Sequence, residues 1–448
     1  MKKRFSTFLV SLCLVLCATS PWAASVWYVD ASSPNDPGTG TLVDPFRAIP
    51  SAVTAAISGD TIQVATGTYP RWTVNATANL TLFFVAPEGA TIDVTTAGGG
   101  PVQITAATTF TADVSFEGFT FSGNAVNKVA GAGAGIKIFT LLNCTIDSTL
   151  GGSGVTTGGG GPNRMTIDGC HVTAPMANQV GANIGGADGE LIVLNSTFDN
   201  FGAQALNAGG DVAYLELRNS IFSNPTGESV NFWNLRGDAV VDRCYFHKAR
   251  GGGDNFLIWG EDAVFDVTIT NSVFDSSTAD AGVPGNNQNL VACNIDGKTI
   301  IRHCTVVANN GAANHQYGWQ ISGNADCEIV NCITVGWTVD DYVGDDPSYT
   351  MTNNWNTASG DPGFVFPATY SPTTYIGLTG DFNPRADSPC RDAGIDVGIL
   401  VDYEGKLRDA TPDIGAFEYV SLEPTPTPGP TRTPVPGAGV DDRWDLYE

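Results

Sequence analysis

A short unit that recurs along the chain constrains its fold more than any other feature. Each copy holds an apolar strand, a one-residue corner and a second short strand, as in SFEGFTF, VLNSTF, LRNSIF and ITNSVF. Successive corners lie 24 to 32 residues apart, for example from position 195 to 219 and from position 271 to 303. The corner residues are Gly118, Asn143, Gly169, Asn195, Asn219, Arg243, Asn271, His303 and Asn331. Repeats of this length with β-rich units indicate a β-solenoid.

The residue types at the corners are those that a sharp bend requires. Seven of the nine are Asn or Gly, which tolerate a left-handed backbone better than other residues do. Arg243 and His303 are the exceptions, so either these two residues are strained or their corners differ. The side chains before each corner alternate as in a half-buried strand, with Leu191 and Val193 pointing inward and Ile192 pointing outward.

Beyond the corner, one position repeatedly holds a large apolar residue. We expect these side chains to stack inside the solenoid as a ladder. They are Phe121, Ile146, Phe198, Phe222, Phe246 and Phe274. The repeat therefore predicts an all-β protein, a parallel β-helix of about ten stacked coils.

The position directly after the corner is Cys or Ser, which indicates a small buried slot. It holds Cys144, Cys170, Cys244, Cys304 or Cys332 in five coils and Ser196, Ser220 or Ser272 in three. Neighbouring coils lie about 4.8 Å apart, so a disulfide between Cys304 and Cys332 is geometrically feasible. We favour free, packed thiols. The pairing of Cys293, Cys327 and Cys390 does not follow from the sequence.

The chain divides into five segments. Residues 1–24 have the layout of a signal peptide, because Lys2, Lys3 and Arg4 precede an apolar run, so we expect a secreted, extracellular or bacterial cell-surface protein. Residues 25–100 form an N-terminal cap and the first coils, 101–340 the repeats, and 341–420 a C-terminal coil and capping segment. Residues 421–448 are a Pro/Thr-rich stalk with a terminal peptide.

A helix near the N-terminus is predicted to cover the end of the stack. Ile49, Val53 and Ile57 fall on one helical stripe, and Gly59 follows as a stop signal. An uncovered solenoid end exposes strand edges that pair with other chains, so a helix is expected there.

The charge of the chain limits its partners. The formal net charge is −25 at pH 7, which repels nucleic acid and anionic lipid headgroups. It favours neutral sugars, cations or polyanions bridged by a divalent metal, unless it serves only to keep the protein soluble. After the N-terminal segment, no apolar stretch reaches the roughly twenty residues of a membrane helix, so we expect no membrane span. We also expect a monomer.

Motifs at both ends of the mature chain resemble a known group of proteins. YVD, SGDTI and GTY between positions 27 and 69, and DFNPRADSPCRDAG with DIGAFEY between positions 381 and 419, are similar to segments of secreted bacterial right-handed parallel β-helix proteins. Those proteins have the pectate-lyase-like fold, some with a C-terminal segment of the surface-anchor type. The resemblance implies a right-handed coil and an extracellular setting. The family contains lyases, hydrolases, epimerases and adhesins, so it implies no single activity.

Aromatic and polar residues recur in the strands that precede the corner strands. Rings spaced by one coil and interleaved with polar groups suit sugars, whose apolar faces stack and whose hydroxyls form hydrogen bonds. We therefore expect binding of a polysaccharide or cell-surface glycan along one face. The alternative for each Trp is a place in the core. The predicted substrate-binding residues are Trp233, Arg236, His247, Trp259, Asn294 and Trp319.

The loop 246–255 joins basic side chains to this track and offers a catalytic alternative. Lys248 or Arg250 would abstract a proton in β-elimination, with Glu261 and Asp262 as neighbouring acids. Because Trp233, this loop and Trp259 fall on consecutive coils, we expect them to converge on one face. The competing interpretation of the loop is a solvated turn.

A lyase also needs the substrate carboxylate neutralised, and calcium held by Asp238 and Asp254 would do this. A glycoside hydrolase would need two opposed carboxylates about 5 to 9.5 Å apart, such as Glu261 or Asp262 with Asp238 or Asp296. A third class is a non-catalytic structural or adhesive surface protein.

Overall fold

The computed structural model describes most of the chain between residues 24 and 420. Its described ranges are 24–93, 102–123, 127–148, 153–158, 160–173, 180–199, 203–208, 210–223, 229–247, 256–260, 264–276, 291–294, 297–308, 317–322, 326–336, 340–344, 350–366 and 380–420. The expected signal peptide, apart from residue 24, and the expected stalk lie outside these ranges.

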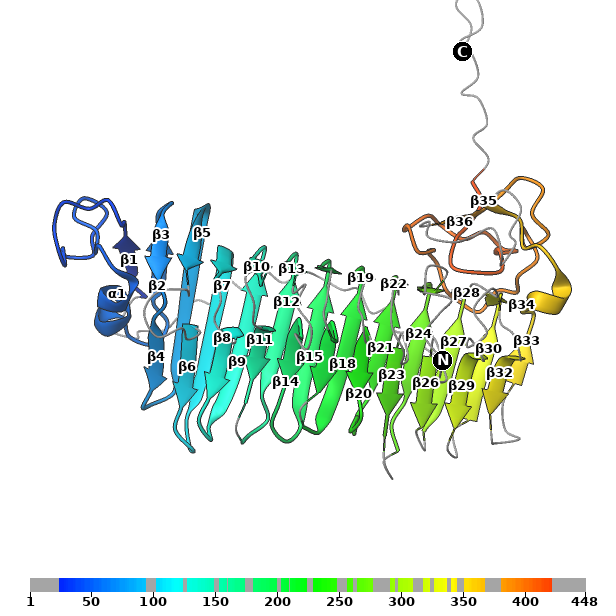
Figure 1. Cartoon of the computed structure of the whole chain (residues 1–448), viewed down its shortest axis with the longest axis horizontal. Coiled ribbons are helices and arrows are strands. Elements are labelled where there is room, and N and C mark those ends of the chain that lie inside the picture. Colours follow the sequence, from blue (N-terminus) through cyan, green and yellow to red (C-terminus); the bar gives the residue numbers. More distant parts are fainter. Residues whose placement is uncertain are drawn as a thin grey trace, which may run out of the picture.

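The strands of the coils stack in parallel, each against its equivalent in the next coil (Figure 1). Leu191 lies opposite Leu215, which in turn lies opposite Ala239. This pairing confirms the predicted parallel β-helix. Each coil contributes strands to three faces, and the strands of two faces belong to one 23-stranded sheet because β5 and β7 run across the bend between them.

Face 1 holds the strands that lead into the corners. They are β1 (Val26–Val29), β2 (Thr61–Val64), β5 (Leu80–Asp93), β7 (Thr111–Ser122), β9 (Ile136–Leu142), β12 (Arg164–Asp168), β15 (Gly189–Leu194), β18 (Val212–Arg218), β21 (Ala239–Asp242), β24 (Val267–Thr270), β27 (Lys298–Arg302), β30 (Asp326–Val330) and β33 (Thr350–Thr352).

Face 2 holds the strands that leave the corners, including the second parts of β5 and β7. The others are β3 (Thr68–Pro70), β10 (Thr145–Asp147), β13 (His171–Thr173), β16 (Thr197–Asp199), β19 (Ile221–Ser223), β22 (Tyr245–His247), β25 (Val273–Ser276), β28 (Thr305–Ala308), β31 (Ile333–Val335) and β34 (Trp355–Asn356).

Face 3 is a separate sheet with 11 described strands, close to the predicted ten coils. They are β4 (Thr73–Ala76), β6 (Val102–Ala106), β8 (Asn127–Ala132), β11 (Ser153–Thr157), β14 (Ala182–Ile184), β17 (Leu206–Ala208), β20 (Val230–Phe232), β23 (Phe256–Trp259), β26 (Val291–Asn294), β29 (Tyr317–Ser322) and β32 (Asp340–Gly344).

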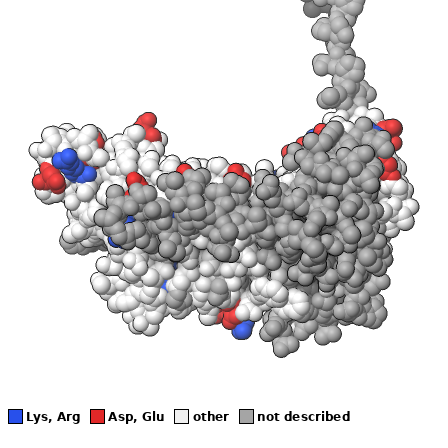
Figure 2. Space-filling model, in the orientation of Figure 1, with Lys and Arg blue, Asp and Glu red and all other residues white. Residues whose placement is uncertain are grey.

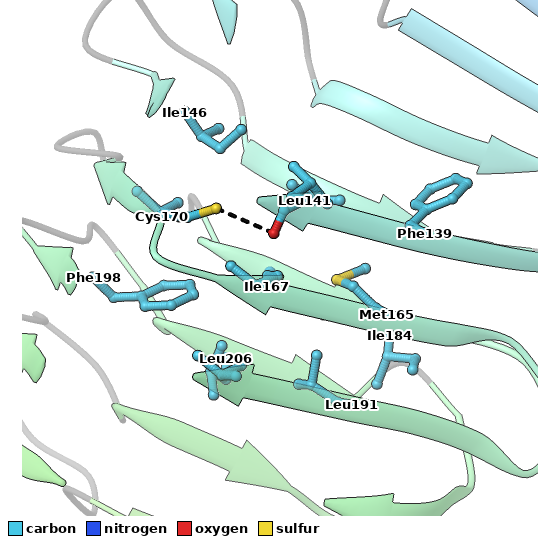
Figure 3. Close-up of a cluster of buried hydrophobic side chains, with 14 of the residues drawn as sticks. Phe139, Leu141, Ile146, Met165, Ile167, Cys170, Ile184, Leu191, Phe198 and Leu206 are labelled. Atoms are coloured by element: carbon cyan, nitrogen blue, oxygen red, sulfur yellow. Dashed lines mark hydrogen bonds between the residues drawn. The ribbon is translucent and has the colours of Figure 1, made fainter. Parts of the chain in front are cut away.

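The core lies inside the coils and follows the predicted alternation. Leu191 and Val193 are fully buried, and side chains from all three faces meet in the cluster of Figure 3. The predicted ladder beyond the corner is also present. Its Phe198, Phe222 and Phe246 rings stack with centroids 5.2 and 5.0 Å apart. Stacked rings and alternating aliphatic side chains thus bury a continuous apolar column, the main source of stability in such a stack.

All nine predicted corners have a left-handed backbone, with φ between 48° and 77°. Arg243 and His303 adopt it as well, with φ of 53° and 52°. Their corners therefore do not differ from the others. The stack imposes the bend, since the N–H of each corner from Asn143 to Asn331 bonds to a carbonyl of the next coil, as from Arg243 to Thr270 at 3.2 Å. Asn353 forms a further corner that the repeat analysis did not include.

The Cys/Ser position is a small buried slot, as predicted. Each side chain accepts the backbone N–H of the equivalent residue one coil earlier, for example Ser196 Oγ from Cys170 at 3.0 Å and Ser220 Oγ from Ser196 at 3.1 Å. The seven described cysteines whose side chains are placed are all free and buried. Cys304 and Cys332 are among them, which confirms packed thiols there. The side chain of Cys293 lies outside the described residues.

Helix α1 (Ile49–Ala55) lies at the N-terminal end of the stack, as predicted (Figure 1). It is shorter than its sequence pattern indicated. Ile49 and Ala52 are buried, whereas Ile57 lies beyond the helix and is 47% exposed. The chain leaves the helix at Ala56, whose ψ of 145° is extended. Within the described residues, no helix is long and apolar enough to span a membrane.

The C-terminal residues 380–420 lie along face 2 of the last coils, above β28 in Figure 1. The short antiparallel pair β35 (Phe364–Phe366) and β36 (Asp381–Pro384) and the single turn η1 (Thr357–Ser359) belong to this end of the chain. The outward residues of face 2 that this segment covers are Val273, Thr305 and Ile333. Val273 and Ile333 are buried in a second core with Ile414 and Phe417.

Charged groups are buried within this C-terminal segment. Arg408 Nη1 lies 3.0 Å from Glu418 Oε2, and both side chains are almost inaccessible to solvent. Asp413 accepts the Tyr419 N–H at 2.6 Å. Burial raises the pKa of Glu418 and of Asp413.

In Figure 2, acidic groups show as red atoms around this segment and along the upper edge of the described surface, in keeping with the excess of carboxylates in the sequence.

Candidate functional site

Two tryptophans form a tilted ring pair on the outside of face 3. Trp233 directly follows β20, and Trp259 ends β23. The register pairs Phe232 with Ile258, so the two indoles sit side by side in adjacent coils. Their ring centroids are 5.5 Å apart with planes inclined by 38°. Trp233 is 50% exposed and Trp259 half-buried, so the predicted outward direction of both is confirmed.

Polar groups lie on the same face and at its edge. On face 3, Asn207 donates from Nδ2 to Asn183 Oδ1 at 3.1 Å, and both side chains are half-buried. At the turn from face 3 to face 1, the exposed Arg236 places Nη1 3.3 Å from Asp211 Oδ2. The Trp pair is therefore accompanied by amides and by a charged pair with donors and acceptors near solvent. This combination suits ligands with apolar faces and hydroxyl edges.

The prediction that Trp319 lines the same surface is wrong. Its side chain is fully buried, and Nε1 donates to Thr334 Oγ1 at 2.6 Å. The ring also meets Phe274 edge-on, with centroids 6.1 Å apart. Since strand side chains alternate, a shift of one position in β29 decides between core and surface. Trp319 fills the core.

His247 does not join the tryptophans either. It lies on β22 of face 2, whereas Trp259 lies on β23 of face 3, so the expected convergence on one face is wrong for these residues. The His247 side chain is nearly buried, with Nδ1 3.2 Å from Asp275 Oδ2. Tyr245 donates its hydroxyl to the same Asp275 oxygen at 2.7 Å. These contacts tie His247 to its own face.

The predicted catalytic residues lie outside the described residues. These are Lys248, Arg250, Glu261 and Asp262, and the same holds for the calcium ligand Asp254 and for the side chain of Asn294. The acid pairs of the hydrolase alternative all include Glu261 or Asp262. These roles stay predictions.

Asp238, the other predicted calcium ligand, is described. Its Oδ1 accepts the Asp266 N–H at 3.0 Å, which links two successive turns. No group of three or more His, Cys, Asp or Glu side chains with metal-binding proximity occurs in the described parts of the chain. Because Asp254 lies outside the described residues, calcium binding by Asp238 and Asp254 stays a prediction.

A charged network on face 1 was not predicted. Glu216 accepts hydrogen bonds from the Tyr214 hydroxyl at 3.0 Å and from Arg218 Nε at 2.5 Å. Asp242 lies 3.6 Å from Arg218 Nη1 and 3.0 Å from Arg243 Nε. The signal was present in the sequence, since these residues occupy the outward positions before two consecutive corners. Their mutual pairing leaves little unmatched charge there.

A pocket of about 370 Å³ lies farther along face 1, beside the C-terminal segment. Its wall includes Lys298, Glu328 and Thr350 from β27, β30 and β33, together with Ile395 and Val397. Sequence reasoning missed it because nothing in the repeat shows where residues 395–397 return to the solenoid. The outward polar residues of three consecutive coils were the only available signal.

The chain is a parallel β-helix protein. No family model matches it, and no curated protein matches it. Among solved structures it is similar to a pectate lyase, with 17% identity, a TM-score of 0.43, and coverage of 89% of this chain and 97% of that one. It is also similar to a rhamnogalacturonan lyase, with 13% identity, a TM-score of 0.40, and coverage of 74% and 87%.

A third similar structure is a GH136 lacto-N-biosidase from Eubacterium ramulus, with 8% identity, a TM-score of 0.44, and coverage of 74% of this chain and 68% of that one. Likenesses at this level of identity and TM-score carry no argument about the activity of this chain. Its function has to be argued from its own residues.

Proposed function

We propose that the protein binds a glycan through the surface formed by Trp233, Trp259, Arg236, Asn183 and Asn207. The observation that carries the proposal is the outward tryptophan pair, in which exposed Trp233 and half-buried Trp259 lie in adjacent coils with ring centroids 5.5 Å apart. Half of the Trp233 surface stays in contact with water, at a cost in hydration free energy that packing inside the coil would avoid. A sugar ring that stacks on the indole would cover this surface.

The geometry of the pair fits an extended ligand better than a compact one. Coils repeat about every 4.8 Å, which is close to the length of one sugar residue, so successive residues of a linear glycan match successive coils. The Asn207–Asn183 amide pair and the Arg236–Asp211 ion pair supply hydrogen-bond donors and acceptors, and the ion pair adds one positive and one negative group. As part of the same proposal, the protein acts outside the cell, supported by the signal-peptide pattern of residues 1–24.

The test is a glycan array followed by calorimetric titration of the glycans that bind. A stacking ring contributes about 1 kcal/mol, so Trp233→Ala should weaken binding about fivefold. Phe83→Ala is the matched control, because Phe83 is an aromatic residue on face 1 that is 41% exposed and far along the stack from the pair. It should leave affinity unchanged. Equal losses in both variants, or no loss in Trp233→Ala, would refute the site.

A further inference from the structure

The pocket at the C-terminal end of face 1 is a built feature of the fold. It forms where β27, β30 and β33 meet Ile395 and Val397 of the C-terminal segment. Asn331 fixes this wall with two hydrogen bonds to Ile395, from Nδ2 to the carbonyl at 2.7 Å and from the Ile395 N–H to Oδ1 at 3.0 Å. Arg302 Nη1 donates to the Val397 carbonyl at 3.3 Å. Side chains of the solenoid therefore hold the wall in place.

One carboxylate of the pocket, that of Glu328, is paired with two cations. Glu328 lies 2.6 Å from Arg302 Nη2 and 3.4 Å from Lys298 Nζ. Burial by itself would raise the pKa of Glu328, but the hydrogen bond and charge of Arg302, with a smaller effect of Lys298, lower it below its usual value. Glu328 is therefore an anion held by two cations. Asp326 adds a second carboxylate to the lining, which therefore holds one cation, Lys298, and two carboxylates. Arg302, which is not part of the lining, offsets one of these carboxylates through its pair with Glu328.

The remaining lining combines hydroxyls with an apolar wall. Thr350 and Thr352 contribute hydroxyls from β33, and Val330, Ile395 and Val397 contribute apolar surface. A ligand that matches both has C–H groups on one side and hydroxyls, which donate and accept, on the other. The lining has no excess of positive charge, so it gives no advantage to an anionic ligand.

We propose that this pocket binds one or two residues of a neutral glycan. Its volume of about 370 Å³ lies at the lower end of the ~300–1,000 Å³ typical of ligand pockets, which suits one or two sugar rings. Lys298 belongs to the coil directly after that of Trp259, so along the axis the pocket begins about 4.8 Å beyond the tryptophan pair. The inference rests on the proposed function for the class of ligand, but uses different residues.

Methyl NMR of the full chain tests the pocket directly. The Ile395 and Val397 methyl signals should shift on titration with neutral β-linked tetrasaccharides of glucose, galactose, mannose or xylose. Tetragalacturonate should shift them less. The Ile221 methyl signals, from a 41% exposed residue on face 2, are the internal control and should stay in place. If none of the four neutral sugars moves the Ile395 and Val397 signals, or if tetragalacturonate moves them more, the proposal is overturned.

A filled pocket provides the second test. Thr350→Trp places an indole in the pocket and should weaken binding of the active tetrasaccharide at least tenfold. Thr268→Trp is the matched control, because Thr268 lies on the same outward ladder three coils earlier, outside the pocket lining. It should change binding less than twofold. Equal affinity of Thr350→Trp and the wild type overturns the proposal, and the NMR result on the wild type decides if Thr350→Trp does not fold.

The two proposals fail separately. If Trp233→Ala weakens binding while the Ile395 methyl signal stays in place, the pocket is wrong and the tryptophan surface stands. If the Ile395 signal shifts while Trp233→Ala binds normally, the tryptophan surface is wrong and the pocket stands. Absence of binding to every glycan refutes both.

Discussion

Replacement of Asn219 by valine tests the corner on which the repeat depends. Asn219 has φ of 50°, a left-handed conformation that a β-branched side chain resists strongly. Its Nδ2 also donates to Asn195 Oδ1 one coil away, at 3.1 Å. Valine would keep the backbone hydrogen bonds of the corner but remove the side-chain hydrogen bond to Asn195. It would also place two methyl groups on a strained backbone.

The expected loss is about 2 kcal/mol in the free energy of unfolding. Backbone strain of a non-glycine residue in this region accounts for ~1–2 kcal/mol. The lost hydrogen bond is exposed to solvent, so it contributes only about 0.5 kcal/mol. Asn219→Gly removes the same bond without strain, and its greater freedom in the unfolded chain costs about 0.5–1 kcal/mol. Glycine should therefore be milder than valine.

Urea denaturation followed by circular dichroism measures the difference. The order wild type, then Asn219→Gly, then Asn219→Val should appear in the denaturation midpoints, with the β-rich spectrum retained in each variant. A valine variant as stable as the wild type would show that the stack does not hold this corner left-handed. A glycine variant less stable than the valine variant would show that backbone strain at this corner is smaller than the conformational entropy that glycine adds to the unfolded chain.

Two further substitutions test the role of buried polar side chains. Burial and the charge of Arg408 lower the pKa of His303 to about 3. The folded protein therefore excludes a proton that the unfolded chain binds below about pH 6.5. The free energy of unfolding is unaffected by this proton above about pH 6.5 and decreases as the pH falls below it. Between pH 7 and pH 5 the wild type should lose up to about 2 kcal/mol more than His303→Asn, measured by urea denaturation at both pH values, and equal losses would contradict this origin. Trp319→Phe should cost about 2–3 kcal/mol, since it leaves a void and removes the bond to the buried Thr334, yet glycan affinity in calorimetry should not change. A normal denaturation midpoint with weakened binding would place Trp319 on the ligand surface after all.

The corners were predictable because each one is a local requirement repeated many times. A left-handed residue between two short strands selects Asn or Gly, and the spacing of these residues fixes the coil. Even Arg243 and His303 could be located, because the neighbouring units set the register. Their conformation could not be read from the residue type, since the bonds that impose it come from adjacent coils.

The candidate site was harder to predict, because surface and core differ by one position in a short strand. Trp233 and Trp319 both follow or occupy face 3 strands, yet one is half exposed and the other fully buried. Their sequence surroundings do not distinguish them. The pocket depends on where Ile395 and Val397 return to face 1, a contact between segments far apart in the chain. The apolar outward residues Val273 and Ile333 were a usable signal that a segment covers face 2 there.

The C-terminal segment on face 2 has a consequence for the order of folding. Contacts between neighbouring coils join residues about 24 positions apart, as at Asn219 and Asn195, whereas Arg408 reaches Asn271 across 137 positions. Closing the longer loop from a disordered chain costs about 1.5 kcal/mol more in entropy, so the segment docks after the coils beneath it have formed. Once docked, it ties several coils together at their corners. The last coils then open as one cooperative block, whereas the central coils are held only by their two neighbours.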